Sequence, residues 1–265
     1  MAENKQALDE DDPLSHPLSL AFPARPPPDE STEQAMVHSF HPFTPQHFTA
    51  ISVGTLVAAV FLVTGRRGGN ARNLSTALLA FINLSVYPLS QAAWLTLAAP
   101  KSVDNFVPLH LCDIAAITAG FALITKRPLL CALTYFWGLA ATVQGLLTPA
   151  ITVGFPHLPF IMFFVHHFAV VTAALYLPLV EGWRPKSPFW KSPLETYAWS
   201  LVYLTVAMTA NHLLGSNFAF ASRPPDNPSL IDHLGPWPWY LLAMQAIAVT
   251  FFLLLALPFR RSVPS

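Results

Sequence analysis

The residues of this chain best suited to chemistry are ionisable groups at the head of one apolar segment. The run PLHLCD at positions 108–113 brings His110, Cys112 and Asp113 within about one helical turn. An ionisable side chain is costly in lipid, so inside a membrane segment it faces a protein interior, a water-filled cavity or a partner. Imidazole, thiol and carboxylate groups perform acid–base and nucleophilic catalysis. The run therefore predicts a functional site, provided that the segment lies in a membrane.

The composition of the chain indicates that it does. Hydrophobic residues make up 53% of the chain and charged residues 11%, and the mean hydropathy is +0.46. Soluble domains carry about 25% charged residues, whereas apolar blocks of about 20 residues span a bilayer as helices. We therefore predict an all-α, polytopic membrane bundle of about seven transmembrane helices. The segments are expected at 46–64, 74–99, 108–125, 129–148, 159–180, 196–216 and 236–258.

Basic residues indicate how the bundle is oriented. Ten of the fourteen Lys and Arg residues follow the first, third, fifth and seventh segments, on one side of the predicted membrane. Cytoplasmic loops carry the excess of Lys and Arg. We therefore expect the N-terminus to be outside the cytosol or lumenal, and the C-terminus to be cytosolic.

The first 45 residues differ in kind from the rest. They hold eight of the fourteen acidic residues and eight prolines, a composition that does not support a packed core. We predict a disordered, acidic, proline-rich tail over 1–45 and a transmembrane domain over 46–260. The domain has only a modest basic excess, which orientation accounts for, so no nucleic-acid partner is expected.

Polar residues inside the predicted helices gather in the outer half of the bundle. At 1.5 Å per residue they lie roughly 3 to 14 Å below the outer ends of the helices. They are Gln91, His110, Asp113, Gln144, His166, His167, Asn211, His212 and Gln245. Such residues also bond helices together in membranes, which explains the three glutamines well. Several ionisable groups at one depth favour an outward or lumenal cavity instead.

Helical geometry sorts the partners within the cluster. His110 and Asp113 are three residues apart and share a helix face, whereas Cys112 lies about 200° around the helix from His110. If Cys112 is a nucleophile, its base must come from another helix, with His166 or His167 as candidates. If it is not, His110 and His167 become the reactive pair, and Asp113 orients one of them. The second cysteine, Cys131, is expected to be a small buried hydrophobic residue.

Three motifs carry a resemblance to a known family. They are PLHLCDIAA, FPHLPFIMFFVHHFAVVTAALY, and NHLLGSNFAF followed by PSLIDHLGPWPWYLL. In this order they resemble the YwaF-like family of integral membrane proteins over about residues 75–258. Its recurrent positions carry over as His110, Cys112, Asp113, His167, Asn211 and Asn217. His167 fits through its spacing to Tyr176, and His166 stays as the alternative.

The same motifs are distantly similar to the vertebrate transmembrane protein 164. That protein is associated with acyl transfer to ether phospholipids through a cysteine, so the resemblance implies covalent acyl transfer here. In the relative the cysteine immediately precedes the histidine of the third helix, and Leu109 occupies that position in this chain.

Two functions follow from these residues. The first is a lipid acyltransferase or esterase acting on phospholipid acyl chains in the outer cavity, through Cys112 or a hydroxyl activated by His110 or His167. The expected substrate-binding residues are Gln144, Asn211, His212 and Asn217, with Asn211 or Asn217 as donor to the oxyanion. The second is a proton- or ion-coupled transporter that uses the same His and Asp groups.

The expected partners are membrane lipids. No cofactor is expected, and a metal site built from the same residues is a weaker possibility because they show no diagnostic ligand spacing. The sequence leaves the oligomeric state and the identity of the membrane open.

Overall fold

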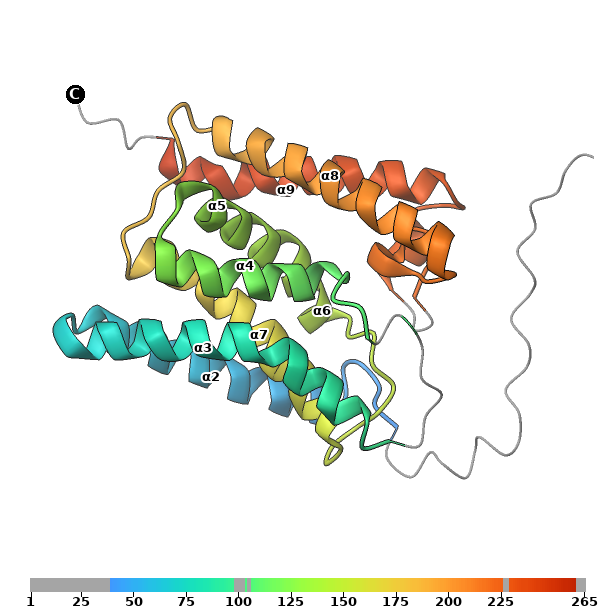
Figure 1. Ribbon diagram of the computed structural model, residues 1–265, viewed down its shortest axis with the longest axis horizontal. Coiled ribbons are helices and arrows are strands. Elements are labelled where there is room, and N and C mark those ends of the chain that lie inside the picture. Colours follow the sequence, from blue (N-terminus) through green and yellow to red (C-terminus); the bar gives the residue numbers. More distant parts are fainter. Residues whose placement is uncertain (1–38, 98–102, 104–105, 226–228, 261–265) are drawn as a thin grey trace, which may run out of the picture. The chain divides into compact units, whose positions relative to one another are not determined.

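The computed structural model describes residues 39–97, 103, 106–225 and 229–260, which are almost entirely helical (Figure 1). Among them the only extended pairing is an isolated antiparallel bridge between Ser39 and Val153. Seven helical segments fall where the sequence predicts them, so the all-α prediction is confirmed. They are α2 (Pro45–Arg66), α3 (Gly69–Trp94), α4 (Leu111–Thr125), the segment Pro128–Leu147 formed by α5, a π-helix and α6, α7 (Leu158–Leu179), α8 (Lys191–Leu214) and α9 (Trp239–Ala256).

Five of these described segments are long and apolar enough to cross a membrane, namely α2, α3, the Pro128–Leu147 segment, α7, and α9 with its extension to Phe259. The chain is therefore an integral membrane protein. The apolar helix α4 has only 15 residues, and α8 is not among the candidate spans. The count of seven spans, and the orientation of the two termini, stay predictions.

Several helix boundaries differ from the predicted ones. Helix α4 starts at Leu111 rather than 108, because the backbone of His110 is extended (φ −68°, ψ 143°). Helix α8 starts at Lys191 rather than 196, because its first turns contain polar residues and precede the apolar block from which its start was predicted. Helix α9 starts at Trp239 rather than 236, after a turn that contains two prolines.

The predicted tail over 1–45 lies mostly outside the described residues and stays a prediction. The described part of it begins at Ser39. Phe40 is buried, and its N–H donates a hydrogen bond of 2.7 Å to the carbonyl of Thr152.

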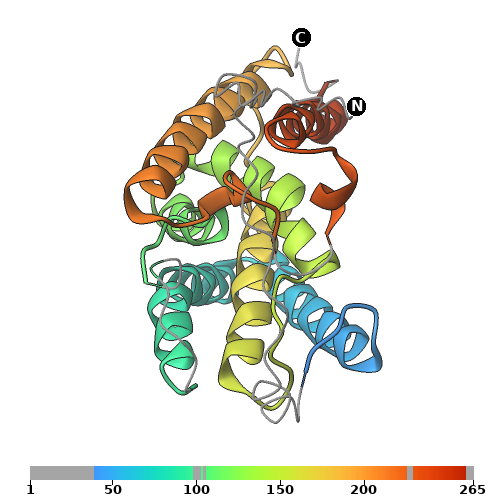
Figure 2. The ribbon, with the colours of Figure 1, turned by 90° about the vertical axis from the view of Figure 1, so that its right-hand side faces the viewer.

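Helix α7 is the central element of the bundle. It packs against α2, α3, α4 and α5, and 67% of its most apolar stretch is buried, compared with 11% for α2. In Figure 1, α2 and α3 lie below α7, while α8 and α9 pack together above it; in Figure 2, α3 (cyan) and α2 (blue) flank α7 (yellow). A side chain on α7 can therefore meet residues from most of the other helices.

Small residues allow these helices to approach closely. The buried face of α4 consists mainly of alanines, at 115, 116, 119 and 122. A Cβ added at Gly120 of α4 would lie 2.5 Å from Leu84 of α3. Helix association in membranes depends on such close packing, since burial of apolar surface gives little driving force in lipid.

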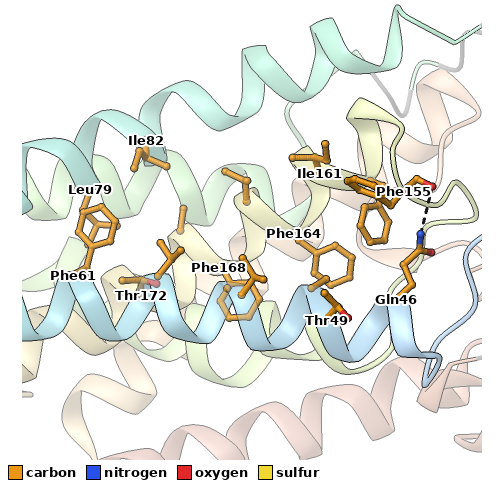
Figure 3. A pocket seen from close by; sticks show the side chains of 17 residues that line it. Gln46, Thr49, Phe61, Leu79, Ile82, Phe155, Ile161, Phe164, Phe168 and Thr172 are labelled. Carbon is orange, nitrogen blue, oxygen red and sulfur yellow. Dashed lines mark hydrogen bonds between the residues drawn. The ribbon is translucent and has the colours of Figure 1, made fainter.

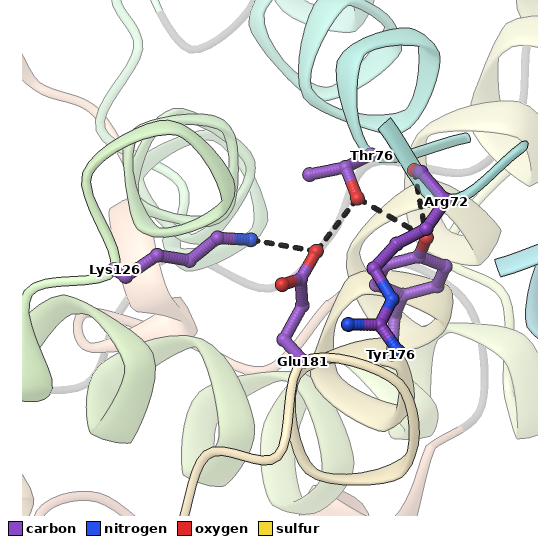
Figure 4. Close-up of polar contacts among 5 residues, drawn as sticks. All are labelled: Arg72, Thr76, Lys126, Tyr176 and Glu181. Carbon is purple, nitrogen blue, oxygen red and sulfur yellow. Dashed lines mark hydrogen bonds and ion pairs between the residues drawn. The ribbon is translucent and has the colours of Figure 1, made fainter. Parts of the chain in front are cut away.

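A polar cluster joins the end of the bundle where α3 begins and where α4 and α7 end (Figure 4). The Glu181 carboxylate accepts a hydrogen bond from Thr76 Oγ1 (2.6 Å) and pairs with Lys126 Nζ (2.8 Å). The Tyr176 hydroxyl lies 3.1 Å from Thr76 Oγ1 and donates to the Arg72 carbonyl (3.3 Å). Burial raises the pKa of Glu181, but the hydrogen bonds from Lys126 and Thr76 and the nearby positive charges outweigh it and hold the pKa below its ordinary value.

This cluster predicts a pH-dependent contribution to stability. A carboxyl whose pKa is lowered by folding stabilises the fold above its unfolded pKa, and the contribution is lost as the pH falls through the folded pKa. Glu181→Gln should lower the thermal midpoint of the detergent-solubilised protein by about 3 °C at pH 7. The difference from the wild type should shrink below the ordinary glutamate pKa of 4.5. Thermal unfolding followed at several pH values measures both effects.

Glu195→Gln is the matched control. Glu195 pairs with Lys186 at 2.7 Å, but the two side chains are 30% and 40% exposed, and surface pairs contribute little. An equal loss of stability in the two variants would contradict the role given to the cluster.

Candidate functional site

The site begins at the amino-terminal end of α4. His110 is the N-cap residue, and its ring contacts the ring of Phe218 at 5.2 Å between centroids. The carbonyl of the preceding residue, Leu109, accepts a hydrogen bond of 3.0 Å from the Tyr203 hydroxyl on α8. Asp113 lies in the first turn of α4 and is only 7% exposed. The start of this helix is thus fixed from both α8 and the α8–α9 loop.

His166 of α7 is the residue that meets this helix end. Its Nε2 lies 3.0 Å from the backbone carbonyl of Cys112. A carbonyl oxygen only accepts, so Nε2 carries the proton and the neutral ring has its lone pair on Nδ1. Nδ1 lies 3.9 Å from Asp113 Oδ1, which is too far for a direct hydrogen bond. The ring is therefore held in one tautomer, with its basic nitrogen beside a carboxylate.

A thiol completes the group. The Sγ of Cys112, a carboxylate oxygen of Asp113 and a ring nitrogen of His166 all lie within 4.8 Å of one another. Asp113 and His166 are buried, and Cys112 is partly exposed. We call these three residues the Cys112 cluster. It contains the three kinds of group that thiol chemistry needs, namely a nucleophile, a base and a carboxylate that can stabilise the protonated base.

The neighbouring His167 points elsewhere. Its Nδ1 donates to the Phe163 carbonyl at 2.8 Å, and its ring stacks on that of Phe163 with centroids 4.1 Å apart. A Cβ added at Gly145 would lie 2.5 Å from His167 Nε2. Successive residues on a helix point about 100° apart, so His166 faces α4 while His167 faces α6 (Val143–Leu147). The sequence left open whether His166 or His167 is the partner of Cys112, and this geometry favours His166.

The predicted substrate-binding residues lie in different surroundings. Asn211 organises the loop after α8: its Oδ1 accepts from the Phe218 N–H (2.7 Å) and the Ser216 hydroxyl (3.0 Å), and its Nδ2 donates to the Phe218 carbonyl (3.0 Å). Asn217 performs a similar role, with Oδ1 accepting from two backbone N–H groups and Nδ2 donating to the Arg223 carbonyl.

The other two predicted substrate-binding residues, His212 and Gln144, lie elsewhere in the bundle. His212 follows Asn211 and is exposed, while Gln144 is half-buried on α6. Asn211 and Asn217 thus hold the loop that touches His110 through Phe218, and their hydrogen bonds engage them with its backbone. Whether any of the four contacts a substrate stays a prediction.

Two features of the site escaped the sequence reasoning. One is Tyr203, which is 9% exposed and fixes Leu109 from α8; its position among apolar residues gave no sign of this contact. The other is the backbone at the start of α4. The first N–H groups of a helix have no acceptor within it and can bind negative charge. Here they belong to Leu111 and Cys112, since the Asp113 N–H donates to the His110 carbonyl (3.0 Å).

A metal ion is a second use for the Cys112 cluster. Its three ligand atoms form the one such group among the described residues, and zinc takes nitrogen, oxygen and sulfur ligands at about 2.0–2.3 Å. The cluster would need to contract slightly around the ion. A bound metal would occupy the thiol sulfur and the lone pair of His166, so it would exclude thiol chemistry.

Comparison with known proteins identifies a family and a bacterial relative. A family model described as the TMEM164 family matches residues 42–256. A protein of Treponema pallidum (strain Nichols), named only as uncharacterized, is 29% identical over 223 residues, covering 82% of this chain and 88% of its own. No solved structure matches. The predicted similarity to transmembrane protein 164 is thereby confirmed, while the YwaF-like label stays a prediction.

The role of Asn211 can be tested against its neighbour in the chain. Asn211→Ala removes a buried side chain with three hydrogen bonds and leaves the Phe218 N–H unpaired, so it should destabilise the protein by roughly 2–4 kcal/mol. His212→Ala removes an exposed side chain and should change the thermal midpoint very little. Equal midpoints for the two variants would mean that the loop does not depend on Asn211.

Proposed function

Because the chain belongs to the TMEM164 family, we propose that it is a membrane lipid acyltransferase or esterase in which Cys112 carries the acyl group. The observation that supports this most directly is the Cys112 cluster, with its sulfur, carboxylate and imidazole nitrogen within 4.8 Å of one another. The distant similarity to a protein associated with cysteine-dependent acyl transfer favours acyl chemistry. Because Leu109 occupies the position of that protein's cysteine, the choice of Cys112 rests on the cluster alone.

The first half of the reaction transfers the acyl group to the enzyme. His166 Nδ1 accepts the proton of the Cys112 thiol, and the sulfur attacks the carbonyl carbon of a phospholipid ester. The tetrahedral intermediate then collapses, the bond to the leaving oxygen breaks, and that oxygen takes the proton from His166. The products are an S-acyl Cys112 and a lysophospholipid. Asp113, 3.9 Å from Nδ1, stabilises the imidazolium that forms between the two proton transfers.

The second half regenerates the thiol. The hydroxyl of a lysophospholipid, or a water molecule, gives its proton to His166 and attacks the thioester carbonyl. The carbon–sulfur bond breaks, and the thiolate of Cys112 takes the proton back from His166. With a lysophospholipid as acceptor the protein is a transferase, and with water it is an esterase.

The negative charge on the carbonyl oxygen needs donors. The backbone N–H groups at the start of α4 adjoin Cys112 and are suited to this role. Asn211 and Asn217 are weaker candidates, because their amide groups bond to the backbone of the α8–α9 loop. Phospholipid esters lie at the boundary between head groups and hydrocarbon, which matches the position of Cys112 at the end of its helix.

Removal of the thiol is the sharpest test. Cys112→Ala should reduce acyl transfer by at least about 100-fold, since loss of a nucleophile removes the covalent step. The purified protein would receive a phospholipid donor with a labelled acyl chain and a lysophospholipid acceptor, and mass spectrometry would follow both the product and a hydroxylamine-sensitive acyl group on the Cys112 peptide. Cys131→Ala is the matched control, because Cys131 is buried in α5, outside the cluster, and should retain activity.

Two results would count against the proposal. Full activity in Cys112→Ala would rule out the acyl-enzyme. Activity that is lost on chelation and restored by zinc would show that the cluster binds a metal.

Lipid analysis of cells without the protein addresses the transporter alternative, in which His110, Asp113 and His167 carry protons or solute. An unchanged acyl composition together with lost uptake of a solute would favour transport.

A further inference from the structure

We propose that a groove between α2 and α7 is a binding site for one acyl chain of a membrane phospholipid, separate from the Cys112 cluster. The groove has a volume of about 540 Å³. Figure 3 shows its lining, in which Phe61 of α2, Leu79 and Ile82 of α3, and Phe164 and Phe168 of α7 face the same space.

The shape of the groove fits a single chain. Its lining follows one face of α2 from Gln46 to Phe61 at helical spacing, a length of about 22 Å at 1.5 Å per residue. The hydrocarbon of one leaflet is about 15 Å thick, so an extended acyl chain can lie along it. A helix of another protein is about 10–12 Å in diameter and is too thick to enter between two packed helices.

The chemistry of the lining points to hydrocarbon. No Asp, Glu, Lys, Arg or His residue lines the groove. Two of its three polar side chains lie at one end and are engaged there, since Gln46 Nε2 donates to the Phe155 carbonyl (3.5 Å) and Thr49 Oγ1 to the Pro45 carbonyl (2.8 Å). The third, Thr172, lies toward the other end, near Phe61 (Figure 3). A polar solute or an ion would lose its hydration there without compensation. Thr49 and Gln46 mark the end at which the ester group of the lipid would lie.

The position of the groove indicates which molecule occupies it. The helices α2, α3 and α7 are all candidate membrane spans, and the lining residues Val53, Val57 and Val165 are 57%, 50% and 40% exposed. The groove is therefore continuous with the lipid-contacting surface of the bundle. A chain of a neighbouring phospholipid can enter it sideways without leaving the hydrocarbon.

The groove and the Cys112 cluster use different faces of α7. Phe164, Val165 and Phe168 line the groove, whereas His166 points to α4 and His167 to α6. The chain in the groove is thus not the acyl group that reacts. Binding in the groove does not depend on the proposed enzyme activity. Since α2 is largely exposed, a bound lipid should stabilise its packing against the bundle.

Photochemical labelling of the full-length wild-type protein tests this directly. Nanodiscs of phosphatidylcholine would contain a phosphatidylcholine with a diazirine at the end of one acyl chain. Occupation of the groove should give adducts on buried lining residues such as Leu79, Ala169 and Thr172, which are 1%, 6% and 3% exposed. Adducts confined to exposed positions of α2 and α7 would show ordinary lipid contact at the surface and would overturn the proposal.

A pair of variants gives an independent measurement. Val57→Trp fills the groove, whereas Val63→Trp places the same side chain at a position of α2 that is 55% exposed and does not line it. Native mass spectrometry should show one phospholipid retained by the wild type and Val63→Trp, and about tenfold less in Val57→Trp. Equal retention in both variants, or none in the wild type, would contradict the site. If Val57→Trp does not fold, the labelling of the wild type decides alone.

Discussion

The hydrogen bond from His166 Nε2 to the Cys112 carbonyl is the contact on which the candidate site depends. It ties the central helix α7 to the first turn of α4, and it fixes which ring nitrogen faces the carboxylate of Asp113. His166 is buried, and a buried polar group has no water to replace a lost partner, so this bond holds the imidazole more strictly than it would at an aqueous surface. The thiol, the carboxylate and the imidazole are thereby brought together from two helices far apart in the sequence.

The helices of this fold were predictable because each apolar block has the length of a membrane span. The ends were less predictable, since a helix can continue past the apolar block, as α8 does towards Lys191, or stop short of it, as α4 does at Leu111. The extended backbone at His110 matters most. It removes His110 from the helical spacing on which its pairing with Asp113 was predicted, and the imidazole 3.9 Å from Asp113 is that of His166.

The sequence also indicated that a base for Cys112 must come from another helix, and it named both histidines of α7. It could not choose between them, because the rotation of α7 depends on what α4 and α6 place against it. Gly145 makes room for His167, and the carbonyl of Cys112 receives His166. Likewise, the sequence around an asparagine does not tell whether its side chain binds a substrate or, like that of Asn211 near the end of α8, the backbone of the following loop.

The π-helix at Trp137–Thr142 interrupts the segment that runs from Pro128 to Leu147. A π-turn holds more residues than an α-turn, with bonds from i to i+5. Residues beyond it are therefore rotated relative to an uninterrupted α-helix, in which each residue adds about 100°. Gly145 is among them, and it reaches His167 from this shifted register. A helical wheel drawn from Pro128 would therefore assign the wrong face to every residue after Thr142.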